Sequence, residues 1–317
     1  MGAWARATRS SSLWKPGLVE TPVIYEEGLT DSRRWATFDF RPGDIVISVP
    51  SKCGTTWLQM MCALLIFGPK LPSPLTYLSP WLDMRLQPAS EIYGRLAGQQ
   101  HRRFIKTHTP LDGLPAHEGV TYVVMGRDPR DVAVSMSHHR ANLDAETIGT
   151  KLGNRTLPAS EVPLALTGDR VRADALTWFY ADDPVPHALS SLKGMTWHLG
   201  QAWHRRSEPN VVVLHYQEVA ADPEGTMKAF SNRLGIAVNA KTWPDLVSAA
   251  RFESMRAGAQ TVIPDEGMGL IKNPAGFFNV GKSGQWADIL TPCDLDHYAA
   301  RVSALVDDDV NKWLHQA

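Results

Sequence analysis

Residues 44–68 limit the choice of fold more than any other stretch of this sequence. They begin with Ile45-Val-Ile-Ser48, a short apolar run rich in β-branched residues, which is typical of a buried strand. Pro50 ends the run, and a loop of small and polar residues follows. From Thr55 onward, apolar residues recur at helical spacing as far as Gly68, which is a stop signal for a helix. The stretch therefore predicts a strand, a short loop and a helix.

The loop between this strand and this helix predicts an anion-binding site. A helix N-terminus presents unpaired backbone N–H groups and the positive end of the helix dipole, which together attract phosphate or sulfate. Lys52 adds a full positive charge, and Thr55 and Thr56 add hydroxyl groups. The pattern is not a Walker A loop. An ordinary strand–helix turn with a solvated lysine is the alternative for this loop taken alone.

Strands and helices alternate along the rest of the chain, which predicts a single α/β domain with a central parallel sheet flanked by helices. Ligands bind such sheets at the carboxyl ends of the strands. Three of the predicted strands precede polar clusters. Besides the strand at residues 45–48, the predicted strands are residues 103–107, 120–125 and 210–214. The predicted later helices are residues 223–234 and 245–256, with one helix or a pair of helices over residues 293–315.

The chain divides into a lead-in and one domain. We expect residues 1–40 to form a partly ordered lead-in and residues 41–317 to form the domain. Within the domain, residues 141–200 look irregular, and we expect them to form an insertion beside the ligand site. Residues 258–286 are rich in Gly and Pro and predict a mobile lid. Aromatic residues suit either an apolar acceptor pocket or the core, namely Tyr77, Trp81, Trp178, Phe179, Tyr180 and Trp197.

Composition argues for a small-molecule ligand. The formal net charge of -1 over 317 residues gives no broad attraction to nucleic acid or to an anionic membrane. No apolar run approaches the roughly 20 residues that a membrane-spanning helix needs. The 3 cysteines lack the spacing of a disulfide framework or a metal site, which fits a reducing compartment. We therefore expect a cytoplasmic protein without a membrane span, a nucleic-acid partner or a bound metal.

Two more polar clusters follow predicted strands. Lys106 and His108 lie two positions apart at a strand end, so their side chains share a face. A neutral imidazole there suits removal of a proton from a hydroxyl group. Arg127 follows the next strand and Ser135 lies just inside the next helix, which suits a second phosphate. Taken singly, a structural histidine, a surface arginine and a helix serine are the alternatives.

Together and in this order, the clusters resemble the cytosolic-type sulfotransferases that use 3′-phosphoadenosine-5′-phosphosulfate (PAPS). Lys52-Cys-Gly-Thr-Thr-Trp57 is similar to that family's Lys-Ser-Gly-Thr-Thr-Trp loop, and Lys106-Thr-His-Thr-Pro110 is similar to its Lys-Thr-His-Leu-Pro segment. Residues 126–135 resemble its 3′-phosphate motif. Residues 216–223 and 250–255 resemble its adenine-binding segments, and residues 79–83 resemble bacterial glycolipid-type members of the mycobacterial kind.

The resemblance implies a P-loop-like sulfotransferase fold and in-line transfer of a sulfuryl group from PAPS to a hydroxyl group. The implied acceptor is a small, lipophilic or glycolipid molecule, and no metal is implied. His108 would act as general base, with Lys52, Lys106 and Ser135 as further catalytic residues. The implied donor-binding residues are Lys52, Cys53, Gly54, Thr55, Thr56, Trp57, Arg127, Ser135, Tyr216, Phe252, Met255, Gly281 and Lys282.

The sequence departs from the family near its C-terminus. The family's third phosphate motif, Arg-Lys-Gly-x-x-Gly-Asp-Trp, here begins with Asn279 and Val280, so two cations are replaced. Losing charge-assisted bonds typically costs about 1.5–3 kcal/mol each. Lys272 and Lys282 are the candidates to compensate. The family's dimerisation signature is also absent, which predicts a monomer or a different dimer.

Two other functions stay open at this point. A nucleotide-binding paralogue without turnover is favoured by the change at Asn279 and Val280. A P-loop-like kinase that uses ATP is disfavoured, because no predicted strand ends in an aspartate that would bind magnesium.

Overall fold

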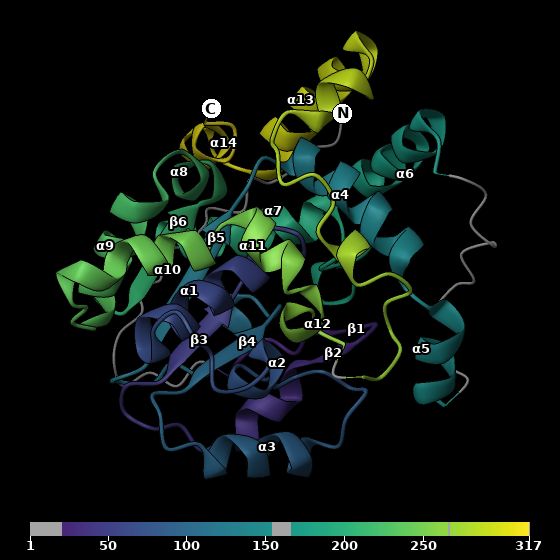
Figure 1. Cartoon of the computed structure of the whole chain (residues 1–317). Coiled ribbons are helices and arrows are strands. Elements are labelled where there is room, and N and C mark those ends of the chain that lie inside the picture. The colour runs from purple at the N-terminus through teal and green to yellow at the C-terminus, as the bar shows by residue number, and fades with distance from the viewer. Residues whose placement is uncertain (1–20, 154–165, 266, 317) are drawn as a thin grey trace.

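A four-stranded parallel sheet with the strand order β4-β3-β5-β6 forms the centre of the fold (Figure 1). The structure is a computed structural model that describes residues 21–153, 166–265 and 267–316. Ile45 pairs with both Phe104 and Thr121, and Tyr122 pairs with Val211. The predicted α/β class with a parallel sheet is confirmed. The strands are β3 (Ile45–Ser48), β4 (Phe104–Thr107), β5 (Thr121–Gly126) and β6 (Val211–His215).

Helices surround this sheet. In Figure 1, α9 and α10 lie to the left of the sheet and α4, α5 and α6 to its right. The helix α1 (Thr55–Phe67) packs against β3 and β4, and α7 (Leu192–His204) packs against β5 and β6. The other helices are α2 (Leu75–Leu78), α3 (Ala89–Gly98), α4 (Pro129–Asn142), α5 (Ala145–Lys151), α6 (Gly168–Tyr180), α8 (Tyr216–Ala221), α9 (Pro223–Leu234), α10 (Trp243–Ala249), α11 (Phe252–Ala257), α12 (Ala259–Val262), α13 (Pro292–Leu305) and α14 (Asp308–Leu314).

Two predictions about helices are wrong. The single helix expected at residues 245–256 is split into α10 and α11, because Arg251 adopts an extended backbone between them. Residues 141–200 are not irregular where the structure describes them, since they form α5, α6 and most of α7. Side chains cap all three helices at the N-terminus, a signal that the scattered Gly and Pro obscured. Residues 154–165 lie outside the described residues.

The described part of the lead-in joins the hydrophobic core through an aromatic cluster. Trp35 is 1% exposed, and its ring centroid lies 5.7 Å from that of Phe38 and 5.8 Å from that of Phe40. The two short strands β1 (Glu26–Glu27) and β2 (Thr30–Asp31) pair antiparallel just before this cluster. Residues 1–20 lie outside the described residues.

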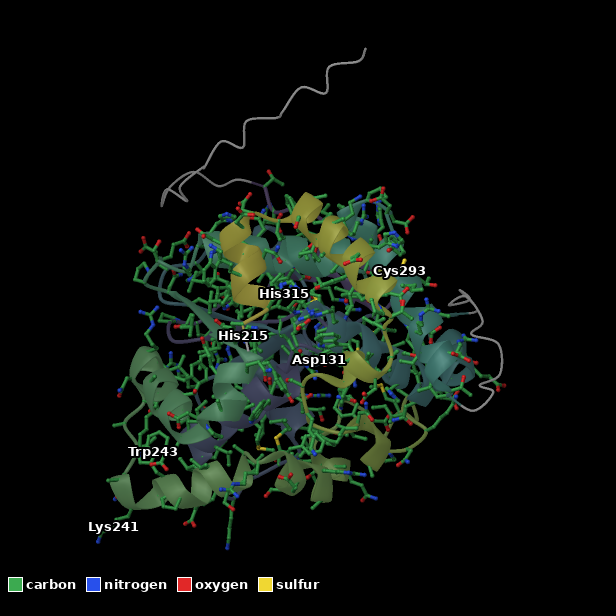
Figure 2. All side chains as sticks on the ribbon, turned by 90° about the horizontal axis from the view of Figure 1, so that it is seen from above. Asp131, His215, Lys241, Trp243, Cys293 and His315 are labelled. Atoms are coloured by element: carbon green, nitrogen blue, oxygen red, sulfur yellow. The ribbon has the colours of Figure 1, made fainter. Side chains whose placement is uncertain are left out.

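The expected lid, residues 258–286, begins with the short helix α12 and then passes in front of α4 on its way to α13 (Figure 1). It contains two 3₁₀ turns, η5 (Ala275–Phe277) and η6 (Gln285–Asp288). Near the start of α4, the carboxylate of Asp131 accepts hydrogen bonds from the backbone N–H groups of Gly284 (3.0 Å) and Gln285 (3.1 Å). Figure 2 shows Asp131 next to the yellow segment that leads into α13. That this segment moves stays a prediction.

We predict that Trp35→Ala lowers the free energy of unfolding by about 3–5 kcal/mol, because it empties a fully buried aromatic site. Urea denaturation measures this loss. Tyr180→Ala is the control, because Tyr180 is 46% exposed and its loss should change stability by no more than about 0.5 kcal/mol. Equal losses in the two variants would contradict the packing described here.

Candidate active site

A cavity of about 1500 Å³ lies at the carboxyl ends of the strands. It exceeds the roughly 300–1,000 Å³ of an ordinary small-molecule pocket, so it has room for two ligands. The loops after β3, β4 and β5, together with α8, α11 and the 278–285 segment, supply its wall. The predicted site residues that it brings together are Lys52, Gly54, Thr55, Thr56, Trp57, Lys106, His108, Arg127, Ser135, Tyr216, Phe252, Met255 and Gly281.

Two predicted donor-binding residues lie outside this wall. Cys53 is fully buried in the core, its backbone N–H donates to the carbonyl of Pro50 (3.2 Å), and burial raises the pKa of its thiol to about 12. Lys282 is exposed and does not line the cavity. Lys272 is also exposed outside the wall, where its ammonium group donates to the carbonyl of Ala141 (3.3 Å). Neither lysine therefore brings charge into the cavity.

The aromatic residues for which a pocket and the core both stayed open mostly lie away from the cavity. Trp178 and Phe179 belong to the core, whereas Tyr77, Tyr180 and Trp197 are exposed and do not line the cavity. Among these six aromatics, only Trp81 contributes to the described wall. The sequence shows that these residues are aromatic. Whether each side chain points into the core, into the cavity or to solvent depends on how α6 and α7 pack.

The loop after β3 turns the start of α1 toward the cavity. Gly54 has a φ of 102° and caps the helix without any side-chain hydrogen bond. A Cβ atom at Gly54 would lie 2.6 Å from the sulfur of Met125, so a larger residue does not fit. The first N–H groups of α1 have no partner inside the helix. The hydroxyl of Thr55, which is buried beside them, has no hydrogen-bond partner among the described residues. This end of the cavity is built to bind an anion.

Lys52 puts a positive charge at the same end. It adopts a left-handed backbone with a φ of 67°, and its Nζ lies 4.6 Å from the ring centroid of Phe277. Burial and the neighbouring Arg127 lower the pKa of Lys52 to about 8. Lys52 is therefore a cation that stays poorly neutralised until an anion binds.

Arg127 is the second cation of this region. It is 6% exposed, its Nη1 donates to the carbonyl of Lys52 (3.1 Å), and its guanidinium lies 4.3 Å from the ring centroid of Tyr216. Its Nε is buried and finds no acceptor in the described part of the chain. Ser135 lines the same cavity from α4. A buried guanidinium with a free donor suits a ligand phosphate.

His108 has the hydrogen bonding of a general base. Its Nδ1 lies 2.6 Å from the carbonyl oxygen of Val49, so Nδ1 carries the proton and Nε2 is left to accept one. Burial, with the charge of Lys106, holds the pKa of His108 well below its usual value and keeps the ring neutral. Trp81 packs edge-on against His108, with ring centroids 4.8 Å apart, and also lies beneath the ammonium of Lys106 at 4.1 Å.

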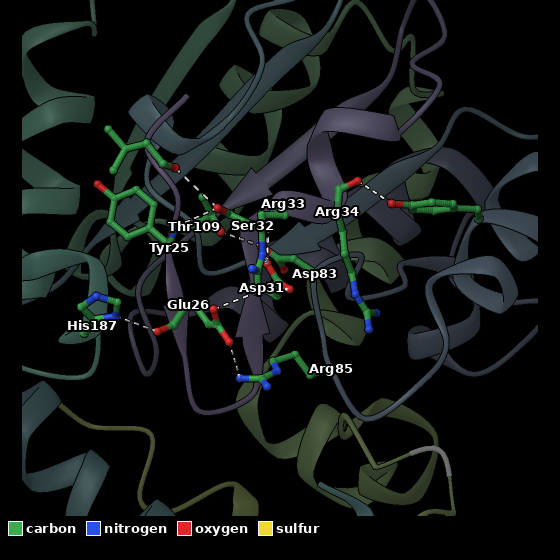
Figure 3. A network of polar contacts seen from close by, with 12 residues as sticks. Tyr25, Glu26, Asp31, Ser32, Arg33, Arg34, Asp83, Arg85, Thr109 and His187 are labelled. Carbon is green, nitrogen blue, oxygen red and sulfur yellow. Dashed lines mark hydrogen bonds and ion pairs between the residues drawn. The ribbon is translucent and has the colours of Figure 1, made fainter. Parts of the chain in front are cut away.

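Asp83 holds the backbone on both sides of His108. The hydroxyls of Thr107 and Thr109 donate to its Oδ2 at 2.5 and 2.6 Å, and the indole N–H of Trp35 donates to the same oxygen at 3.0 Å. Figure 3 shows Asp83 and Thr109 in this network. Asp83 is fully buried, which raises its pKa. This role of Asp83 was not predicted from the sequence. An aspartate between apolar residues, as in residues 79–84, was a sign that its carboxylate is buried and hydrogen-bonded.

The part of the wall formed by α4, α5, α6 and residues 270–271 contains residues that were not predicted from the sequence. We call it the acceptor half. His139 lies one helical turn after Ser135 on α4, and burial holds its pKa well below the usual value. The hydroxyl of Ser137 donates to Asp174 (2.6 Å). Apolar wall residues in this half include Leu143, Ile148, Leu270 and Ile271. The spacing from Ser135 would have identified His139, but the rest depends on tertiary packing.

The described ranges contain neither a candidate metal cluster nor a helix that could span a membrane. No group of three or more His, Cys, Asp or Glu side chains there is arranged to hold a metal ion. No helix there is long and apolar enough to cross a membrane.

The chain is similar to known sulfotransferases. The family model described as a sulfotransferase domain matches residues 42–309. A glycolipid sulfotransferase of Mycobacterium bovis (strain BCG / Pasteur 1173P2) is 36% identical over 309 residues, covering 93% of this chain and 94% of the relative. A glycolipid sulfotransferase of Mycobacterium tuberculosis (strain ATCC 25177 / H37Ra) is likewise 36% identical, over 308 residues, with the same shares of both chains covered.

Solved structures have the same fold. Retinol dehydratase in complex with androsterone and PAP matches with a TM-score of 0.66 and 20% identity, over 87% of this chain and 84% of that chain. The mouse sulfotransferase SULT7A1 complexed with PAP matches with a TM-score of 0.65 and 20% identity, over 90% of this chain and 93% of that chain.

We predict that His108 titrates below its usual range and that Lys106→Met raises its pKa, because Lys106 disfavours the charged imidazole. NMR of the histidine rings against pH measures both effects and also reports the tautomer. Lys70→Met, at an exposed lysine outside the cavity wall, should leave the titration unchanged. A His108 that titrates at its ordinary value in the wild type would contradict the burial described here.

Proposed function

Because this chain belongs to the sulfotransferase family, we propose that it moves a sulfuryl group from PAPS to a hydroxyl group of a glycolipid or another lipophilic acceptor. The observation that carries the proposal is the pairing of two features in one cavity. An uncapped helix N-terminus with Lys52 and Arg127 suits an anionic donor, and a neutral His108 suits deprotonation of an acceptor. The donor named in this proposal supplies the activated sulfuryl group.

The donor end fits a nucleotide with two anionic groups. The loop at Lys52, Thr55 and Thr56 would hold the 5′-phosphosulfate, because backbone N–H groups and the unpartnered Thr55 hydroxyl converge there. Arg127, with its unpaired Nε, and Ser135 would hold the 3′-phosphate. The rings and thioether that would surround adenine are those of Trp57, Tyr216, Phe252 and Met255. PAP in solved structures of the same fold supports this class of donor.

The acceptor half supports a molecule with both polar and apolar parts. Leu143, Ile148 and Ile271 suit a hydrocarbon portion, whereas Ser137 and Asp174 offer hydrogen bonds to hydroxyl groups. The mycobacterial relatives are named as glycolipid sulfotransferases, which supports an acceptor of the same class.

His108 would take the proton of the acceptor hydroxyl at Nε2, since Val49 holds the proton on Nδ1. Lys106 and Lys52 lower the pKa of His108 in the free protein. An anion bound beside these lysines offsets their charge, so His108 becomes a stronger base when the donor is present. This coupling favours proton removal after the donor has bound.

Lys52 would stabilise the negative charge that develops on the leaving phosphate oxygen as the sulfuryl group departs. Its ammonium group needs no large movement, because it already lies inside the cavity. Lys106 would add positive charge near the transferring group, and Ser135 would help to position the donor. Positioning and charge stabilisation supply most of the rate in group transfers of this kind.

A donor-binding protein without turnover is the second candidate. The absence of cations at Asn279 and Val280 favours it, because these two positions bring no positive charge to the cavity. A kinase has less support, since the strands β3, β4, β5 and β6 end at Ser48, Thr107, Gly126 and His215 rather than at an aspartate.

We predict that labelled PAPS transfers sulfate to a glycolipid or lipophilic alcohol, and that His108→Ala lowers kcat by about 10²–10⁴-fold through loss of the base. His204→Ala, at an exposed histidine on α7 outside the cavity wall, is the control and should retain full activity. An acceptor panel with ATP and Mg²⁺ runs in parallel. Transfer from ATP alone would favour the kinase, and PAP binding without any transfer would favour the binding protein.

A second prediction concerns pH. Lys52 acts as a cation and has a pKa lowered to about 8, so kcat/KM for PAPS should fall as the pH rises through about 8. Lys52→Arg keeps its charge at these pH values and should move this decline upward, whatever its effect on the maximal rate. An unchanged decline in Lys52→Arg would show that another group is responsible.

We also propose a cytoplasmic location and a monomer, or a dimer that differs from the one formed by the family's dimerisation signature. Light scattering after size exclusion measures the oligomeric state directly.

A further inference from the structure

Arg251 is a cation in the cavity wall that the sequence patterns did not identify. It lies at the break between α10 and α11, where its extended backbone interrupts the expected helix. The next residue, Phe252, packs against Phe278 with ring centroids 5.7 Å apart. A Cβ atom at Gly281 would lie 2.6 Å from the Phe252 ring. Arg251 is therefore next to the residue that packs against the 278–281 segment.

That segment is where positive charge is missing. Asn279 lines the cavity, but its amide nitrogen donates to the side chain of Gln285 (3.2 Å). Val280 is 49% exposed and is not part of the wall. Lys272 and Lys282 lie outside it as well. The segment itself thus supplies no cation to a ligand in the cavity.

The positively charged side chains of the described wall fall into three groups: those near His108, those with protein partners and those that remain for a ligand. Lys52 and Lys106 lie near His108, where both lower its pKa. Arg140 donates to the carbonyl of Ser190, and Arg170 is paired with Asp174 in the acceptor half. Arg127 and Arg251 are the remaining cations of the described wall. Arg127 lies over the ring of Tyr216, and Arg251 directly precedes Phe252, so each cation is next to one of the rings of the wall.

Both guanidinium groups have donors to spare. Arg251 forms no hydrogen bond, ion pair or ring contact with any described residue through its side chain, and the buried Nε of Arg127 is unpaired there. A guanidinium fork matches the oxygens of a phosphate, and charge-assisted bonds are about twice as strong as neutral ones. Glu253 also lines this wall, so removal of Arg251 would leave a carboxylate close to the bound anion.

We propose that Arg251 binds the 3′-phosphate of the donor together with Arg127, in place of the two cations that are absent at Asn279 and Val280. The inference rests on the proposed function, because it takes a 3′-phosphorylated adenosine nucleotide as the donor. It makes the break between α10 and α11 part of the donor site and explains how the chain can bind the nucleotide without the family's third motif.

The test compares two nucleotides that differ only at the 3′ position. Isothermal titration calorimetry measures the Kd of PAP and of AMP, which lacks the 3′-phosphate, for the full chain and its variants. Arg251→Ala should weaken PAP by about 10- to 100-fold, the range for one charge-assisted contact, and should change AMP by less than about twofold. Arg251→Lys should recover part of the PAP affinity.

Arg256→Ala is the matched control. Arg256 is exposed on the same short helix and its loss removes the same charge, but it lies outside the cavity wall. Both nucleotides should bind this variant as they bind the wild type. Thermal unfolding of each variant checks that the fold is retained.

Four outcomes would overturn the inference. Unchanged PAP affinity in Arg251→Ala, or an equal loss for PAP and AMP, would show that Arg251 does not contact the 3′-phosphate, while the proposed donor would stand. A similar loss of PAP affinity in Arg256→Ala would show that the loss in Arg251→Ala comes from the change in net charge and not from a direct contact. Failure of the wild type to bind PAP would instead overturn the donor assignment, and this inference with it.

Discussion

The turn between β3 and α1 is the constraint on which the site depends. Lys52 and Gly54 both adopt left-handed backbones there, so the chain reverses direction within a few residues and aims the start of α1 at the ends of the strands. The sulfur of Met125 and the ring of Tyr216 fill the space that a side chain at position 54 would need. The anion-binding end of the cavity therefore depends on contacts with β5 and α8 as well as on the loop itself.

The cavity combines a cationic end with a neutral imidazole at His108, and burial affects the pKa of both groups. Removal from water lowers the pKa of Lys52 and of His108, and the positive charges reinforce each other in this effect. An anionic donor reverses that balance, because its charge stabilises the protonated forms. The hydrogen bonds from Thr107 and Thr109 to Asp83 keep His108 in place while the charges around it change.

The fold and most of the site were predictable because the relevant signals are local. Apolar β-branched runs marked the strands, and the residues directly after them had to meet at one edge of a parallel sheet. The errors arose where orientation depends on distant partners. Cys53 turns into the core, and Trp178 and Phe179 are buried in the core and do not line the cavity. Residue 251 breaks a helix that its own neighbours would continue. Helix periodicity contains no information about these contacts.

The sequence by itself determined the family, the order of the strands along the chain and most of the polar residues that meet in the cavity, because motifs and periodicity are properties of neighbouring residues. Only the tertiary structure decided which cations enter the cavity, with Lys282 excluded and Arg251 included. It also decided that the threonines beside His108 are fixed by Asp83. These outcomes depend on the packing of segments far apart in the chain, which sets where each side chain points.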